Sequence, residues 1–286
     1  MTEAEKIQYW KRYARQTTIY ERSGAVHFQL AINKTINPVI KHIAAHGVES
    51  ALLSIDILVD RKIIEQAFTD FYVHVAKKHK LWADQELKRR LARKKDRLPT
   101  VNVDVASADA GLGIGFFNPE WLRKLKNLVY GLKAAQKVTQ VTNTIKKKLR
   151  AVLGRAVKEE VRPSVIAKRI QSEMDSDKFS ARRSKVIART EATYIANQAA
   201  KQSAIETMEL TGLVLKKIWI DTRDDRVRDT HWINPHPIGF NEKFVVGDSL
   251  MDVPGDPDGE AKEVIQCRCA VSYIPAEDHE DIFPTI

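Results

Sequence analysis

The stretch "SARRSKVIARTEATYIANQAAKQSAIETMELTGLVLKKIWI" (residues 180–220) contains the change of hydrophobic period that decides the fold. Up to Gly212, apolar side chains recur every three or four residues, which predicts a long, alanine-rich helix. Gly212 suits the end of a helix, and "LVLKKIWI" behind it is typical of a strand. We therefore predict an α+β fold, with a mostly helical N-terminal body of long helices followed by a small irregular mixed α/β C-terminal domain.

Helical patterns and breaks predict four consecutive parts. Within the first, "NPVIKHIAAHG" places Asn37 at an N-cap, Pro38 at a first helical position and Gly47 at a helix end. Gly-Pro-Asp turns dominate the last part. The predicted parts are a helical region at 1–97, an extended hinge or arm at 98–118, a helical region at 119–212 ending in the long alanine-rich helix, and a small acidic C-terminal domain at 213–286.

The overall composition is that of a globular protein. Of 286 residues, 43% are hydrophobic and 29% are charged, and the length exceeds that of a usual single domain. No apolar run approaches the ~18 to 20 residues that cross a bilayer, and the polar N-terminus lacks a signal-peptide core. We expect no membrane contact during assembly. Two cysteines do not make a disulfide framework, which favours synthesis in a reducing cytoplasm.

Charge is distributed unevenly along the chain. Residues 1–220 hold 41 Lys and Arg against 22 Asp and Glu, whereas residues 221–286 hold 6 against 15, for a net charge of +10. A basic body attracts polyanions such as DNA, although Lys-rich solvated helix faces have the same composition. Two basic runs supply the candidate nucleic-acid contacts, which are Lys88, Arg89, Arg90, Arg93, Lys94, Lys95, Lys146, Lys147, Lys148 and Arg150.

Both cysteines of the chain lie one residue apart in "IQCRCAVSYI" (265–274). With His231 and His236, Cys267 and Cys269 have the ligand types of a tetrahedral zinc site, although the C-x-C spacing is not that of a zinc finger. If this stretch is a strand, both thiols point to one face. The alternatives are two buried thiols that flank an outward-pointing Arg268, or a pair of thiols with a redox or disulfide role.

The segment "DTRDDRVRDTHW" (221–232) concentrates acids beside a histidine. Asp224, Asp225 and His231 are the residues that a metal-dependent nuclease or another DNA-processing enzyme would use, because hard oxygen ligands suit magnesium. The interleaved arginines favour a loop of ion pairs instead. No established nuclease or hydrolase signature accompanies the segment, so we predict no catalytic residue.

Three motifs occur in a fixed order: "IARTEATYIANQAA" (187–200), "WIDTRDDRVRDTHW" (219–232) and "VPGDPDGEAKEVIQCRCAVSYI" (253–274). In this order they resemble the phage Mu F-like head-morphogenesis family, the minor head proteins of tailed phages, over about residues 150–275. The matching positions, here called the hallmark cluster, are Arg189, Thr190, Glu191, Asp224, Arg228, His231, Cys267, Arg268 and Cys269.

The resemblance implies a structural protein of the virion head, assembled in the host cytoplasm and placed near the portal vertex. It implies the portal protein as partner, with the major capsid protein and packaged double-stranded DNA as further candidates, and a role in DNA packaging, retention or delivery. It carries no enzymatic role and no required cofactor. Because a buried charge must be paired, we expect Glu191 to meet an arginine of the C-terminal domain, Arg228 or Arg268.

Overall fold

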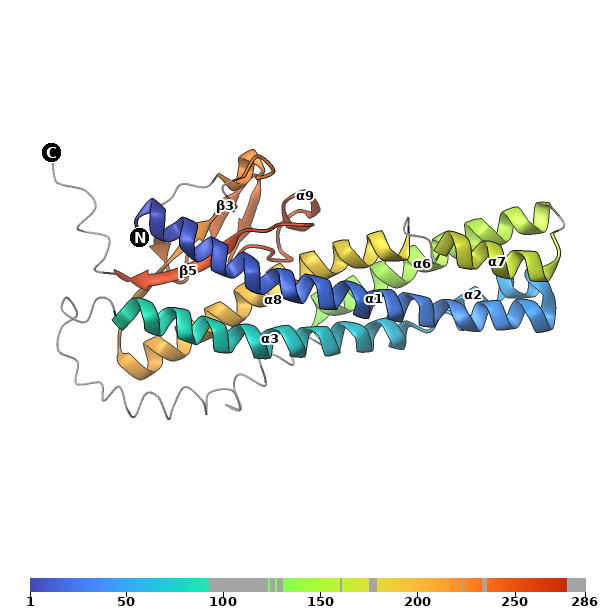
Figure 1. The fold of residues 1–286 in the computed structure, drawn as a ribbon, viewed down its shortest axis with the longest axis horizontal. Coiled ribbons are helices and arrows are strands. Elements are labelled where there is room, and N and C mark those ends of the chain that lie inside the picture. The colour runs from blue at the N-terminus through green and yellow to red at the C-terminus, as the bar shows by residue number, and fades with distance from the viewer. Residues whose placement is uncertain are drawn as a thin grey trace. The chain divides into compact units, whose positions relative to one another are not determined.

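The computed structural model describes residues 1–92, 123, 127, 131–159, 161–174, 179–222, 224–232 and 236–276. It confirms the predicted fold class, with long helices followed by short strands (Figure 1). The predicted hinge at 98–118 lies outside the described residues. The helices are α1 (Glu3–Leu53), α2 (Ile55–Leu58), α3 (Arg61–Ala92), α6 (Leu132–Lys158), α7 (Pro163–Met174), α8 (Ser180–Thr211), the 3₁₀ helix η2 (Asp229–His231) and α9 (Ala261–Val264).

The strands form two small antiparallel sheets in the C-terminal part of the chain. One has the order β2-β1-β5, and the other is the hairpin β3-β4. Their bounds are β1 (Leu215–Ile220), β2 (Ile238–Gly239), β3 (Phe244–Val246), β4 (Ser249–Met251) and β5 (Ala270–Pro275).

The chain folds into two compact units, each built from separate pieces of sequence. Unit 1 contains Met1–Tyr20, Val73–Leu125 and Arg189–Ile286, and unit 2 contains Glu21–Tyr72 and Lys126–Ala188. Helices α1, α3 and α8 each contribute residues to both.

Helix boundaries follow the predicted capping residues except near Pro38. Gly212, with a φ of 68°, ends α8 as predicted. Gly47 has a φ of 82° and kinks α1. The predicted helix start at Asn37 and Pro38 is wrong, because α1 continues through Pro38. The helix survives the lost backbone hydrogen bond since the side chains along this face are buried, namely Ile32, Ile36, Val39 and Ile43.

No single helix in the described part of the chain has the length and apolar character needed to cross a membrane. The helix pair Glu3–Leu53 and Ile55–Ala92, bent by 109°, satisfies that length and composition test only when the two are taken together.

Unit 2 has an aromatic core between α1 and α3. Phe28 packs edge-on against Phe68 and Phe71, with ring centroids 5.0 and 5.2 Å away. A Cβ at Gly24 would lie 2.4 Å from the Phe71 ring, so this close approach of α1 requires glycine. The face of α3 that contributes to this core is buried at Ile64, Phe68, Phe71 and Tyr72.

In unit 1, helices cover both faces of the three-stranded sheet. Alternate residues of β1 enter different clusters, as the two-residue period of a strand requires. Leu215 and Trp219 pack with alanines of α3 and α8. Ile218 and Ile220 pack in a cluster with the α1 residues Tyr9 and Tyr13. The first turns of the chain are therefore part of the C-terminal core, which the sequence did not predict.

A buried ionic cluster joins α3 to α8 within unit 1. The Lys80 ammonium lies 3.0 Å from an Asp84 oxygen and 2.7 Å from a Glu206 oxygen, and all three side chains are buried. Burial lowers the pKa of Lys80, but the hydrogen bond to Glu206 and the charge of Asp84 raise it, and the net shift is upward. Lys80 therefore stays charged in the interior.

Candidate functional site

Polar side chains on one face of α8 bind the backbone that precedes β5. Thr190 accepts a hydrogen bond at Oγ1 from the Gln266 N–H (3.0 Å). Thr193, three residues later, donates from Oγ1 to the Cys267 carbonyl (2.7 Å). Helix residues three and four apart share a face, so both hydroxyls meet the same segment.

Asn197 continues this row and is fully buried. Its Oδ1 accepts a hydrogen bond from the Val271 N–H (2.8 Å) in β5. Its Nδ2 lies 3.1 and 3.2 Å from the carbonyl oxygens of Pro254 and Cys269, and 3.2 Å from the Tyr13 hydroxyl. One amide thus joins α1, α8 and two segments of the C-terminal domain.

Sequence analysis missed Thr193 and Asn197. The available signal was two polar residues that continue the spacing of Thr190 along a helix face that also carries Ala200 and Ala204. Such a row, buried on one helix face, indicates hydrogen bonding to another backbone, because buried polar groups are satisfied.

The turn before the cysteines has a rare backbone conformation. Gln266 has a φ of 59°, a left-handed value that residues with a Cβ seldom adopt. This turn directs the Gln266 N–H to Thr190, and its side-chain Oε1 lies 3.4 Å from an Arg189 nitrogen that donates to it. Contacts with Arg189 and Thr190 therefore hold the turn in place.

Arg268 forms a bidentate ion pair with Asp224. Its two terminal nitrogens lie 2.7 and 2.8 Å from the two carboxylate oxygens. Hydrogen bonds from Arg268 hold the pKa of Asp224 well below its usual range. The sequence prediction named Glu191 as the acid for Arg228 or Arg268. The structure places Asp224 at Arg268, and Arg228 donates to the carbonyls of Glu263 and Ile265.

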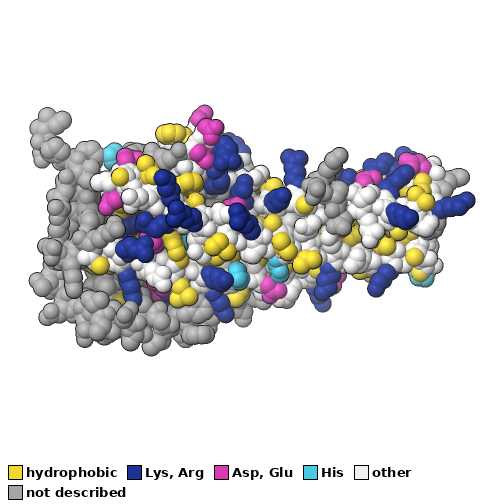
Figure 2. All heavy atoms as spheres, in the orientation of Figure 1, with side chains coloured by type: hydrophobic (Ala, Val, Ile, Leu, Met, Phe, Trp, Pro, Cys, Tyr) yellow, Lys and Arg dark blue, Asp and Glu magenta, His cyan; other side chains and the backbone are white. Residues whose placement is uncertain are grey.

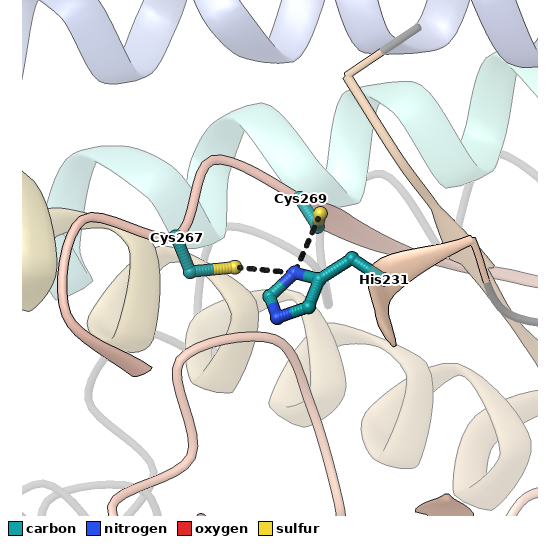
Figure 3. Close-up of side chains that lie close together, drawn as sticks. All are labelled: His231, Cys267 and Cys269. Atoms are coloured by element: carbon teal, nitrogen blue, oxygen red, sulfur yellow. Dashed lines mark hydrogen bonds between the residues drawn. The ribbon is translucent and has the colours of Figure 1, made fainter. Parts of the chain in front are cut away.

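His231 faces both thiols in the interior of unit 1 (Figure 3). Its Nδ1 lies 3.4 Å from the Cys269 sulfur and 3.7 Å from the Cys267 sulfur. Its Nε2 lies 3.0 Å from Glu263 Oε2. His236, the fourth residue of the proposed zinc set, is exposed and lies outside this group of ligand atoms.

The cysteines lie in the loop 267–269, not in the strand predicted there, because β5 begins at Ala270. The turn at Gln266 and the hydrogen bonds from α8 to the Cys267 and Cys269 carbonyls replace a strand ladder. The two sulfurs are nevertheless brought together, by a loop rather than by strand alternation.

The two thiols affect each other's protonation. A hydrogen bond from Cys269 lowers the pKa of Cys267 well below that of a free thiol. The hydrogen bond with Cys267, together with burial, raises the pKa of Cys269.

Residues 133–272 match the family described as Phage Mu protein F like protein. This segment belongs to that family. It is a family of phage head morphogenesis proteins. Neither a search of curated proteins nor one of solved structures found a match. The Phage Mu F-like segment contains the whole hallmark cluster.

Asp224 and Asp225, the two acids of the alternative nuclease hypothesis, lie in different environments. Asp224 is bound to Arg268, and Asp225 is exposed. Among the residues described, the group that could hold a metal combines His231 with the two cysteines and includes no aspartate. The ion-paired interpretation of this loop therefore fits the geometry better.

Several predicted nucleic-acid contacts have partners within the chain. Arg90 donates to Ser272 Oγ and to the Tyr273 carbonyl, which corrects its assignment as a surface contact. Arg89 pairs with Glu86. Arg93, Lys94 and Lys95 lie outside the described residues.

The basic run on α6 is partly neutralised within unit 2. Lys146 and Arg150 pair with Asp56, and Lys148 pairs with Glu173. Of the remaining predicted contacts, Lys147 is exposed and Lys88 is half-buried.

Proposed function

We propose that the chain is a structural minor head protein of a tailed-phage virion, bound at the portal vertex in few copies. The observation that carries this proposal is that residues of the hallmark cluster make contacts within the fold. Its described contacts hold α8, the Asp224 loop and the cysteine loop to one another. Residues that hold segments together in this way maintain the shape of a binding surface. Such a role agrees with membership of a head-morphogenesis family.

The charge distribution supports an acidic partner for the helical part. Lys and Arg side chains are widespread over the face drawn in Figure 2, whereas Asp and Glu are fewer. Packaged double-stranded DNA and an acidic surface of the portal protein are both polyanionic, and both would be attracted. The acidic residues 221–286 would favour contact with protein, including the major capsid protein, over contact with DNA.

From this position the protein would act in DNA packaging, retention or delivery, after assembly in the host cytoplasm. The test is quantitative mass spectrometry of gradient-purified particles of the phage that encodes the chain. We expect copies of the same order as the portal protein and far below the major capsid protein. Absence from mature particles, or a count matching the major capsid protein, would contradict the proposal.

A further inference from the structure

His231, Cys267 and Cys269 bring three metal-ligand atoms together in the interior of the C-terminal domain. All three residues are about 1% exposed, and their ligand atoms lie within 4.8 Å of one another. We infer that they form a Zn²⁺ site, with Nδ1 of His231 and both sulfurs as ligands. This inference does not depend on the proposed function.

The distances agree with those between ligands of one zinc ion. In tetrahedral sites zinc lies ~2.0–2.1 Å from nitrogen and ~2.3 Å from sulfur, which places a nitrogen and a sulfur about 3.5 Å apart. The two nitrogen–sulfur distances are 3.4 and 3.7 Å. A set of two thiolates and one imidazole selects zinc over the hard ions magnesium and calcium.

Groups around His231 orient it for metal binding. Glu263 accepts from Nε2, so the neutral imidazole carries its proton there and turns the Nδ1 lone pair toward the sulfurs. The Thr230 hydroxyl donates to the same Glu263 oxygen (2.7 Å), and the Trp219 ring meets the imidazole edge-on. A carboxylate behind a histidine ligand is a recurrent feature of zinc sites.

A zinc ion here would join two loops that have little regular structure. His231 ends η2, whereas the cysteines lie in the loop 267–269, and Glu263 lies in the one-turn helix α9. Binding would displace the thiol protons, and its free energy would add to that of folding. The described ligands number three, which leaves the fourth position for water or another group.

The test is metal analysis of the full-length protein, purified without chelator and then dialysed. We expect close to one zinc per chain, and we expect cobalt(II) exchanged into the same protein to give a thiolate-to-cobalt charge-transfer band. The His231→Gln variant and the Cys267→Ser/Cys269→Ser double variant should both lose the zinc. The matched control, His236→Gln, changes an exposed histidine of the same domain and should keep it.

Glu263→Gln tests the orientation of His231 separately. We expect it to fold and to bind zinc roughly 10- to 100-fold more weakly in competition with a chromogenic chelator. Zinc well below one equivalent, no cobalt–thiolate band, and both thiols reacting freely in the wild-type protein would overturn the inference. That result would leave a hydrogen-bonded pair of buried thiols, without bearing on the protein's presence in the virion.

Discussion

Replacing Asn197 by alanine is expected to lower the free energy of unfolding by about 3 to 5 kcal/mol. The truncation removes the acceptor for the Val271 N–H and a donor for the carbonyls of Pro254 and Cys269. These groups are buried with the amide, and a buried polar group without a partner retains its full desolvation cost. Breaking a network of this kind is among the few causes of such large effects.

Urea unfolding followed by tryptophan fluorescence measures this change. The tryptophans that the structure describes, Trp10, Trp82, Trp219 and Trp232, all belong to unit 1. The control is Gln198→Ala, which removes the half-buried neighbouring amide and should change stability by less than about 1 kcal/mol. Equal effects of the two substitutions would show that Asn197 does not join these segments.

Acidification is expected to destabilise the protein through His79. This residue is fully buried among the rings of Tyr13, Tyr20 and Trp82, and its ring nitrogens have no hydrogen-bond partner in the described structure. Burial lowers the pKa of His79 to about 3 from an ordinary value of 6.5. The unfolded chain therefore binds a proton that the folded chain excludes.

The sign of the pH effect follows from these two pKa values. The contribution of His79 to stability is complete above pH 6.5 and is lost as the pH falls toward 3. At pH 5 the loss is about 2 kcal/mol relative to pH 7. The His79→Leu variant should lose that much less stability between pH 7 and 5, whereas the exposed control His46→Leu should behave as wild type. Parallel pH profiles for wild type and His79→Leu would contradict the prediction.

Local patterns were sufficient to predict several elements of the fold. The helix ending at Gly212 and the strand after it were predictable because period and capping residues are properties of neighbouring positions. The uninterrupted α1 at Pro38 was not, since burial on both sides of the proline outweighs its local preference. The packing of Tyr9 on β5 was also unpredictable, because a contact between residues 262 positions apart produces no periodic pattern in the sequence.

The candidate site was predictable in membership but not in its pairings. Motif order identified His231 and both cysteines as a group. These side chains come together because of the left-handed turn at Gln266, and the residue types there do not predict such a turn. The acid opposite Arg268 had several candidates of equal charge, and only the folded path of the loop selects Asp224.

The central claim is that the hallmark cluster holds α8, the Asp224 loop and the cysteine loop to one another. A double-mutant cycle on Asp224 and Arg268 tests this claim most directly. Unfolding free energies are measured for wild type, Asp224→Ala, Arg268→Ala and the double variant. A bidentate pair predicts that each single change destabilises the protein and that the two are coupled by about 1 to 2 kcal/mol. Effects that add within about 0.5 kcal/mol, or an Asp224→Ala variant as stable as wild type, would contradict the claim and return Asp224 to the candidates for catalysis.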